Sequence, residues 1–401
     1  MRWRAEGVIV EVVIAGAVRT PIGKFGGALA SLNAVQLGTA VAKSVFERTG
    51  VDPEKVDQAI FGNVYQAGSG QNVARQIAVH AGMPVTSTAM TINEVCGSGL
   101  KAIRLGQAAI AMGDADIVLV GGTESMTNVP YYDTSARWGA KFGDRELVDG
   151  LVKDGLQDAF SGVAMGITAE NVAAQYNVTR EEQDAWALES HRRAIAAQDF
   201  GKFEDEIVPL TIKTRKGTVV VKEDEGPRRD TSLEKLARLR TSFTSAGTVT
   251  AGNASALNDG ASAMLLLRRD VADAMGIRYD AVLDAYAEAG VDPQVMGYAP
   301  YYVVKRLLKK TGKDKADIDL FELNEAFAAQ SVAVTRALDL DSAKVNVNGG
   351  AIALGHPLGD SGARIVTTLI HELKNSDKKT GIAALCIGGG LGVGFQLHVV
   401  D

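Results

Sequence analysis

Apolar positions along the chain change their period in a regular way. Segments of strand length alternate with segments whose apolar residues recur at helical spacing. Early in the chain this pattern predicts strands at 11–20, 58–64 and 115–122, and helices at 33–48 and 97–112. The run DIVLV within the third strand is apolar on both faces, which is typical of a central strand covered by helices on both sides. The alternation predicts an α/β fold.

The middle of the chain breaks this pattern. From about residue 126 to 252 it is richer in aromatic, polar and charged residues, and 213–230 predicts a surface hairpin followed by a charged loop. Alternation resumes at 262–270, so we interpret the middle stretch as an insertion into an α/β body. The predicted organisation is an extension (1–7), a first half (8–126 with 254–277), an inserted domain (127–253) and a second half (278–401).

Two distant segments share one order of features. In both 95–122 and 354–390 a glycine-flanked reactive residue precedes a helix, an apolar strand and a glycine pair. Two βαβ-rich halves built alike would explain this order. Generic α/β construction explains it nearly as well, so the similarity alone leaves a duplication open.

Composition narrows the class of protein. A chain of 401 residues exceeds what one core usually supports. The net charge is −6 and the cations are scattered, which argues against a nucleic-acid or membrane partner. The start of the chain does not resemble a signal peptide, so a cytoplasmic protein is expected. Two distant cysteines form neither a disulfide framework nor a metal motif, so we expect no metal.

Cys96 lies in the segment NEVCGSGL, directly before a predicted helix. The helix N-terminus favours an anion, so a thiol pKa of about 8.5 is expected to fall to roughly 3.5–7.5. A buried structural cysteine is an equally good reading of this segment alone.

Three further residues are candidates for chemistry. Of the five histidines only His356 lies in a glycine-rich turn, where Gly355 and Gly359 would let backbone approach a ligand, so it is the candidate base. Cys386 is the first residue of the glycine-rich segment CIGGGLGVG. Taken alone it is best interpreted as a core residue, but together with Cys96 and His356 it is better interpreted as a thiol that acts as acid and base. Asn324 follows a predicted strand, where α/β sheets place ligand contacts, although a helix N-cap is the simpler account.

Together these side chains indicate acyl transfer through a thioester enzyme. A cysteine protease needs only one thiol. Forming a carbanion next to a thioester carbonyl needs a positioned base, which the second thiol would supply.

Seven segments in order and spacing resemble the thiolase family, from about Val8 to the C-terminus. They are NEVCGSGLKA, GGTESM, MGITAENVA, TAGNASALNDGASA, NEAFAAQ, GGAIALGHPLGDSGAR and CIGGGLG. Within this family the chain resembles the acetyl-CoA C-acetyltransferases in particular. It implies a thiolase fold, in which two duplicated halves form a layered αβαβα core with an inserted loop domain.

The resemblance also implies roles for single residues. Cys96 would be acetylated after His356 takes its proton, and Cys386 would deprotonate the methyl group of a second acetyl-CoA. Asn324 would hold a water that joins His356 in polarising the thioester oxygen of this second substrate. The backbone N–H groups of Cys96 and Gly388 would form the other oxyanion hole, each donor lowering the barrier by about 3 to 4 kcal/mol.

The inserted domain resembles the CoA-binding domain of the family. The matching positions are Met165 and Ser255 along the pantetheine, Leu156, Arg228 and Phe243 near the nucleotide, and Ala326 and Phe327 at the tunnel. An ordinary position in a surface loop, without contact to CoA, also explains Arg228. The implied partners are acetyl-CoA, acetoacetyl-CoA and CoA as substrates, with no cofactor and no metal, in a homotetramer or homodimer.

Two positions depart from the family pattern. Many biosynthetic members carry histidine where this chain has Ala164. Asp360 replaces a small or apolar residue and is expected either to raise the pKa of His356 or to face solvent. The reaction implied is condensation of two acetyl-CoA to acetoacetyl-CoA. The alternatives are a degradative 3-ketoacyl-CoA thiolase for longer chains and a non-catalytic acyl-CoA-binding homologue. A ketoacyl synthase would carry histidine at position 386.

Overall fold

The computed structural model describes residues 4–5, 8–139, 141–215 and 217–400. Most of the predicted extension, residues 1–3 and 6–7, lies outside this range. Within it Arg4–Ala5 (β1) pairs with Val8–Ile9 (β2) in a short antiparallel ladder. No helix among the described residues is long and apolar enough to cross a membrane.

One mixed sheet runs through the molecule in the order β14-β15-β16-β13-β3-β12-β7-β5-β6, and β4 adds to β12. Its strands are β3 (Val12–Arg19), β4 (Gly23–Lys24), β5 (Gln58–Gly62), β6 (Thr88–Ile92), β7 (Ile117–Ser125), β12 (Asn258–Arg268), β13 (Ala281–Gly290), β14 (Leu320–Leu323), β15 (Thr380–Ile387) and β16 (Leu391–Val399). The predicted central strand is β7, which is buried along its whole length between β5 and β12.

The two halves of this sheet repeat one pairing pattern. In the first half β5 is parallel to β7, β7 is antiparallel to β12, and β12 is antiparallel to β3. In the second half β14, β15, β16 and β13 pair in the same sequence of directions. Among the described residues, the two half-sheets are hydrogen-bonded to each other where β13 pairs with β3, at Ala281↔Ile14 and Val282↔Val13. The predicted construction from two similar halves is confirmed.

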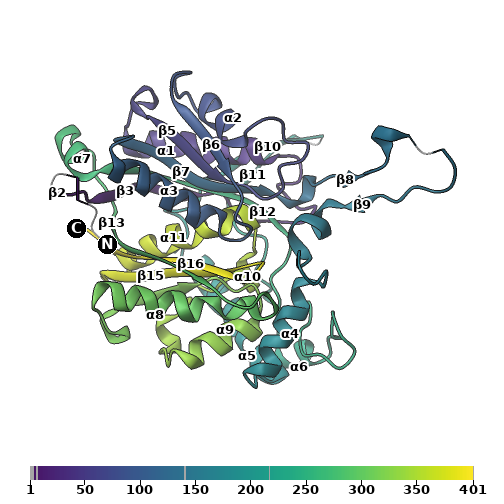
Figure 1. Cartoon of the computed structure of the whole chain (residues 1–401). Coiled ribbons are helices and arrows are strands. Elements are labelled where there is room, and N and C mark those ends of the chain that lie inside the picture. The colour runs from purple at the N-terminus through teal and green to yellow at the C-terminus, as the bar shows by residue number, and fades with distance from the viewer. Residues whose placement is uncertain (1–3, 6–7, 140, 216, 401) are drawn as a thin grey trace.

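Helices divide this body into layers (Figure 1). α3 and α11 pack against each other between the two half-sheets, α1 and α2 cover the outer face of the first half, and α8 and α9 cover that of the second. Separate buried apolar clusters fill the spaces between these layers, which is the expected αβαβα arrangement. These helices are α1 (Ala34–Thr49), α2 (Val73–His80), α3 (Ser98–Met112), α8 (Ala299–Thr311), α9 (Ala328–Ala337) and α11 (Leu358–Asn375). The short α7 (Arg269–Met275) and α10 (Ala351–Leu354) complete the body.

The two ends of helix α1 are determined by a few residues that are adjacent in sequence. The Asn33 side chain accepts from the backbone N–H of Gln36, whose side chain accepts in return from the Asn33 N–H. Gly50 ends the helix in a left-handed conformation with φ 69°. The predicted helix at 33–48 is therefore confirmed within a residue at each end.

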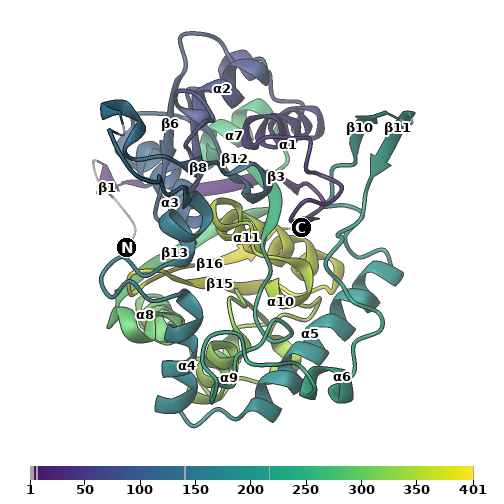
Figure 2. The ribbon, with the colours of Figure 1, turned by 90° about the vertical axis from the view of Figure 1, so that its right-hand side faces the viewer.

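The middle segment follows the side of the molecule that faces the viewer in Figure 2. It consists of a long arm with β8 (Tyr131–Tyr132) and β9 (Val148–Asp149), the helices α4 (Met165–Gln175), α5 (Arg180–Asp199) and α6 (Leu233–Ala237), and the hairpin of β10 (Leu210–Thr214) and β11 (Gly217–Val221). The predicted surface hairpin is thus confirmed.

A buried ion cluster ties this segment to the body. Arg19 at the end of β3 is fully buried and donates to Glu206 at 2.5 Å and to Asp224 at 2.7 Å. Removing any one of these buried charges would leave its partners unpaired, so the cluster links the segment to β3.

Candidate active site

The N-terminal turns of α3 and α11 touch, and each follows a candidate residue. Cys96 precedes the N-cap of α3, and His356 precedes that of α11. A Cβ added to Gly99 would lie 2.5 Å from the backbone N of Ala363. Only glycine permits this approach, so backbone contact brings Cys96 and His356 to one place.

The glycines near these residues allow close packing within the protein. A Cβ on Gly359 would lie 2.7 Å from the Glu124 carboxylate, and one on Gly355 would lie 2.5 Å from the Asn258 side chain. Gly355 also lines the pocket of Arg228 described below, and the expected approach of a ligand to these glycines stays a prediction. A Cβ on Gly388 would lie 3.4 Å from Met165 Sδ and 3.7 Å from a methyl of Val95, and all three residues line the cavity described next.

Cys96, His356 and Gly388 line one largely apolar cavity of about 410 Å³. Six of the seven residues expected to contact CoA line the same cavity: Leu156, Met165, Phe243, Ser255, Ala326 and Phe327. Ala164, the first departure from the family pattern, also lies in its wall.

Arg228 lines a separate pocket of about 290 Å³ instead, whose walls are both polar and apolar and include His191. Ala254, Ala256 and Leu257 form walls of both this pocket and the apolar cavity. Arg228 is therefore next to the cavity rather than inside it.

Burial controls the protonation of Cys96. The backbone N–H groups of Gly388 and of Cys96 itself face the sulfur and lower its pKa, but burial outweighs them and raises the pKa to about 11. The Glu124 carboxylate raises it further. The expected fall in pKa is thus wrong for the unliganded protein, because desolvation exceeds the effect of the helix terminus. The sulfur stays protonated until a base takes its proton.

The hydrogen bonds of His356 determine its tautomer. Ser361 donates its hydroxyl to the Pro357 carbonyl at 2.8 Å, so its oxygen accepts from Nδ1 of His356 at 2.6 Å. Nε2 therefore keeps its lone pair, and it lies 3.4 Å from Nδ2 of Asn324. Burial, and secondarily the charge of Arg364, lowers the His356 pKa to about 3, so the imidazole is neutral at neutral pH.

Asp360 fulfils neither expectation stated for it. It is 1% exposed, so it does not face solvent, and the pKa of His356 is lowered rather than raised. Burial raises the Asp360 pKa to about 7, and the smaller opposing effect of the neighbouring Ser262 hydroxyl does not cancel this rise.

Asn324 lies beside His356 and is not a helix cap. Helix α9 has Phe327 as its N-cap, whereas Asn324 is buried at the end of β14 beside His356. Its Oδ1 has no partner among the described residues, so the amide retains a free acceptor.

Cys386 lies at the end of β15, behind the cavity wall. It is 1% exposed and packs against Met296 and Ala326, both of which line the cavity. Its Sγ donates to Oε1 of Gln330 at 3.0 Å, and Gln330 in turn donates to the Asn324 carbonyl at 3.1 Å. Burial, with a further contribution from the Cys96 sulfur, raises the Cys386 pKa strongly. A second thiol is therefore held next to the first.

Three neighbouring residues escaped the sequence analysis. Ser361 and Gln330 lie inside two of the seven segments that resemble the thiolase family. Their short distance in sequence from His356 and Asn324 could have indicated that they contact these residues. His191 on α5 gave none: it accepts from the Arg228 backbone N–H at 3.2 Å, and burial lowers its pKa to about 4.

Two family models together match nearly the whole chain. The model described as "Thiolase, N-terminal domain" matches residues 12–270, and "Thiolase, C-terminal domain" matches residues 277–399. The chain belongs to the thiolase family. This thiolase is 52% identical over 388 residues to the acetyl-CoA acetyltransferase of Pseudomonas aeruginosa, covering 96% of this chain and 99% of the relative.

Two further comparisons agree. The acetyl-CoA acetyltransferase of Chromobacterium violaceum is 52% identical over 390 residues, covering 97% of this chain and all of the relative. The crystal structure of the Bacillus anthracis acetyl-CoA acetyltransferase superposes with a TM-score of 0.95 at 45% identity, covering 98% of this thiolase and 99% of that chain. The similarity therefore extends over both halves and the middle segment.

Proposed function

We propose that this thiolase condenses two molecules of acetyl-CoA to acetoacetyl-CoA and CoA, reversibly, through an acetyl group on Cys96. The observation that carries the proposal is the pairing of two buried thiols with one neutral histidine at an apolar cavity. Relatives of this chain that are named acetyl-CoA acetyltransferases support the choice of acyl group.

In the first half-reaction Cys96 attacks the thioester carbon of acetyl-CoA. Nε2 of His356 takes the thiol proton, and the proton leaves with the CoA thiol when the carbon–sulfur bond breaks. The negative charge that develops on the carbonyl oxygen is stabilised by the N–H groups of Cys96 and Gly388. Both groups already face the sulfur, which supports this assignment.

In the second half-reaction the Cys386 thiol first gives its proton to the neutral imidazole of His356, and the resulting thiolate takes a proton from the methyl group of a second acetyl-CoA. The carbanion attacks the acetyl carbon on Cys96, a carbon–carbon bond forms, and the bond to the Cys96 sulfur breaks. The Cys96 sulfur then takes the proton held by His356, so both thiols and the neutral imidazole are regenerated. We assign the polarisation of the second thioester oxygen to His356 and a water on Asn324, whose position beside Nε2 supports it.

The thioester arm of the substrate fits the apolar cavity. We place the pantetheine along Met165 and Ser255, the tunnel at Ala326 and Phe327, and Leu156 and Phe243 toward the nucleotide. We assign the nucleotide phosphates to the adjoining pocket with Arg228, because the two spaces share walls.

A degradative thiolase for longer 3-ketoacyl-CoA chains is the second candidate, since Ala164 leaves room in the cavity wall where a histidine would stand. Rates of thiolysis across a series from acetoacetyl-CoA to long-chain 3-ketoacyl-CoA separate the two. A rate that falls with chain length supports the acetyl enzyme, whereas a strong long-chain preference assigns the degradative function.

Intact-protein mass measurement tests the covalent step. Incubation with acetyl-CoA is expected to add one acetyl group to the wild type and none to Cys96→Ser. The absence of an adduct on the wild type would identify a non-catalytic acyl-CoA-binding protein.

We further propose that the protein acts in the cytoplasm as a homo-oligomer. The two free thiols that the chemistry uses require a reducing compartment. The arm around β8 and β9 extends away from the body (Figure 1) and exposes Trp138, Phe142 and Leu147. Another copy of the chain would bury these exposed apolar side chains, and this supports the proposal of a dimer or tetramer.

A further inference from the structure

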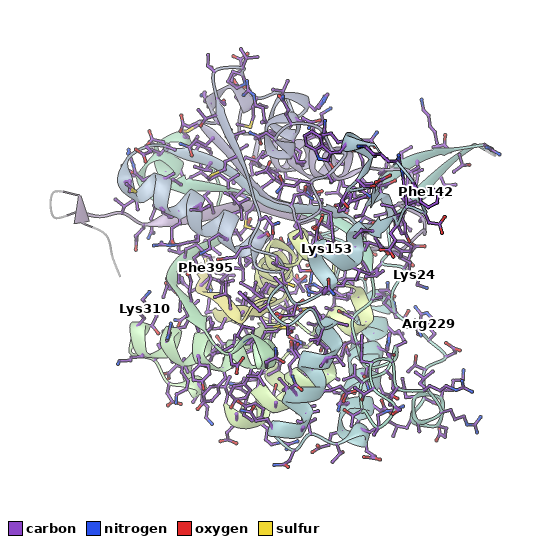
Figure 3. All side chains as sticks on the ribbon, turned by 45° about the vertical axis from the view of Figure 1, so that its right-hand side comes forward. Lys24, Phe142, Lys153, Arg229, Lys310 and Phe395 are labelled. Atoms are coloured by element: carbon purple, nitrogen blue, oxygen red, sulfur yellow. The ribbon has the colours of Figure 1, made fainter. Side chains whose placement is uncertain are left out.

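A second cavity, of about 370 Å³, lies apart from the proposed active site. Its walls come from α3, the end of α8, β13 and β16, and it includes none of the residues assigned to catalysis or to CoA. Figure 3 shows Lys310 of this cavity at the edge of the molecule opposite Lys24, which lines the pocket of Arg228.

Three cations face this cavity without a carboxylate partner among the described residues: Arg104, Lys310 and Lys313. Their polar contacts are neutral. Arg104 donates to the Gln107 side chain, Lys310 to the backbone carbonyl of Tyr286, and Lys313 to the Thr380 hydroxyl. Burial and the nearby charge of Arg104 lower the pKa of Lys310, as expected for two cations held close together.

The carboxylates around the cavity are already paired with other groups. Asp284 accepts from Nδ1 of His398 at 2.8 Å, and Glu11 accepts from Arg269 at 2.8 Å. Glu288, next to Arg104, accepts from Lys101 at 2.6 Å. Three cations and two carboxylates, Glu11 and Asp284, therefore line the cavity, and Glu288 acts on Arg104 and Lys310 from outside it, so the cations are in modest excess.

A buried amide lies in the same wall. Gln396 on β16 is fully buried, and its side-chain amide lies 2.9 Å from the Thr311 hydroxyl, which also lies 3.0 Å from the Leu307 carbonyl. The amide is therefore held in place by α8 beside the three cations.

We propose that this cavity binds a small oxyanion of the phosphate class, held by Arg104, Lys310 and Lys313. Guanidinium and ammonium N–H groups together match the several acceptor oxygens of a phosphate. The volume exceeds that of inorganic phosphate, so a phosphate monoester also fits. This site is independent of the proposed reaction, because it shares no residue with the catalytic or CoA-binding set.

Isothermal titration of the full-length protein tests the proposal. Inorganic phosphate and glycerol phosphate serve as separate probes, with sodium chloride at matched ionic strength as the blank. The variants are Lys310→Met and Arg104→Met, which keep much of the aliphatic stem. Lys309→Met, at the next exposed position on α8, is the matched control, and Arg228→Met removes a cation from the proposed CoA site.

We expect binding to the wild type, Lys309→Met and Arg228→Met, and about tenfold weaker binding to Lys310→Met and Arg104→Met, the effect of losing one charge-assisted hydrogen bond. Tighter binding of glycerol phosphate than of phosphate assigns the site to monoesters, and the reverse order assigns it to the free ion. Absence of binding by both probes overturns the proposal. So does binding that Arg228→Met abolishes and Lys310→Met leaves intact.

Discussion

Nδ1 of His356 lies 2.6 Å from the hydroxyl oxygen of Ser361, and that hydroxyl is itself committed to the Pro357 carbonyl. The oxygen can therefore only accept from the imidazole, which places the ring proton on Nδ1 and leaves Nε2 as the base. A residue five positions after the histidine, in the first turn of α11, thus prepares the imidazole for taking a proton at the cavity.

Replacing Ser361 with alanine is expected to slow acetylation of Cys96 about tenfold, because one hydrogen bond of about 1.4 kcal/mol no longer fixes the tautomer. The KM for acetyl-CoA should change little, since Ser361 is not in the cavity wall. Rapid-quench mass measurement of the acetyl adduct gives this rate. Ser376→Ala is the matched control, because Ser376 makes a similar bond to a backbone carbonyl at the far end of α11. Equal slowing in both variants would indicate a general effect on the helix.

Gln330 is expected to affect only the second half-reaction. Its Oε1 accepts the Cys386 proton, so Gln330→Met should misplace that sulfur and lower the condensation rate about tenfold while acetylation of Cys96 stays within twofold. Hydrogen–deuterium exchange at the acetyl-CoA methyl, measured beside adduct formation, separates the two steps. Gln175→Met, at an exposed position on α4, should change neither rate. A parallel loss of acetylation would contradict the assignment.

Much of the fold was predictable because its signals are local. The apolar run of β7 and the capping residues Asn33 and Gly50 of α1 depend on a few adjacent positions. The motifs also placed Cys96, His356 and Asn324 beside strand or helix ends, which is where the structure has them.

Properties that depend on three-dimensional burial were not predictable in this way. The helix terminus at Cys96 indicated a lowered pKa, but the sulfur is buried, and desolvation reverses the shift. Likewise, the glycines near His356 gave no sign that Glu124 and Asn258, from distant parts of the chain, pack closely against Gly359 and Gly355. His191 gave no signal because its partner lies in a loop 37 positions away.

Phe243 is expected to contribute to substrate binding rather than to chemistry. It lies over Gly166 at the cavity and makes an edge-to-face contact with Phe327 at 6.4 Å between ring centroids. Phe243→Ala removes apolar contact worth about 1–2 kcal/mol, so the KM for acetyl-CoA should rise about tenfold with kcat within twofold. Steady-state kinetics measure both values. Phe200→Ala, at a residue that is 82% exposed, is the control, and a fall in kcat at constant KM would refute the binding role.

Asp360 is expected to make stability depend on pH around neutrality. Burial raises its pKa from the usual 3.8 to about 7, so between these values the folded protein holds a proton that the unfolded chain has released. The free energy of unfolding therefore falls as pH rises through this window. In Asp360→Asn this contribution is absent, because the amide does not titrate.

At pH 8 Asp360→Asn should be more stable than the wild type by about 1–3 kcal/mol, and this advantage should shrink as the pH falls toward 5, where the wild-type carboxyl regains its proton. Urea unfolding at pH 5, 6.5 and 8 measures the difference. Asp114→Asn, at an exposed carboxylate after α3, should track the wild type at every pH. A stability difference that is constant with pH would mean that Asp360 keeps its ordinary pKa in the folded protein, and that the buried carboxyl is solvated or paired in solution.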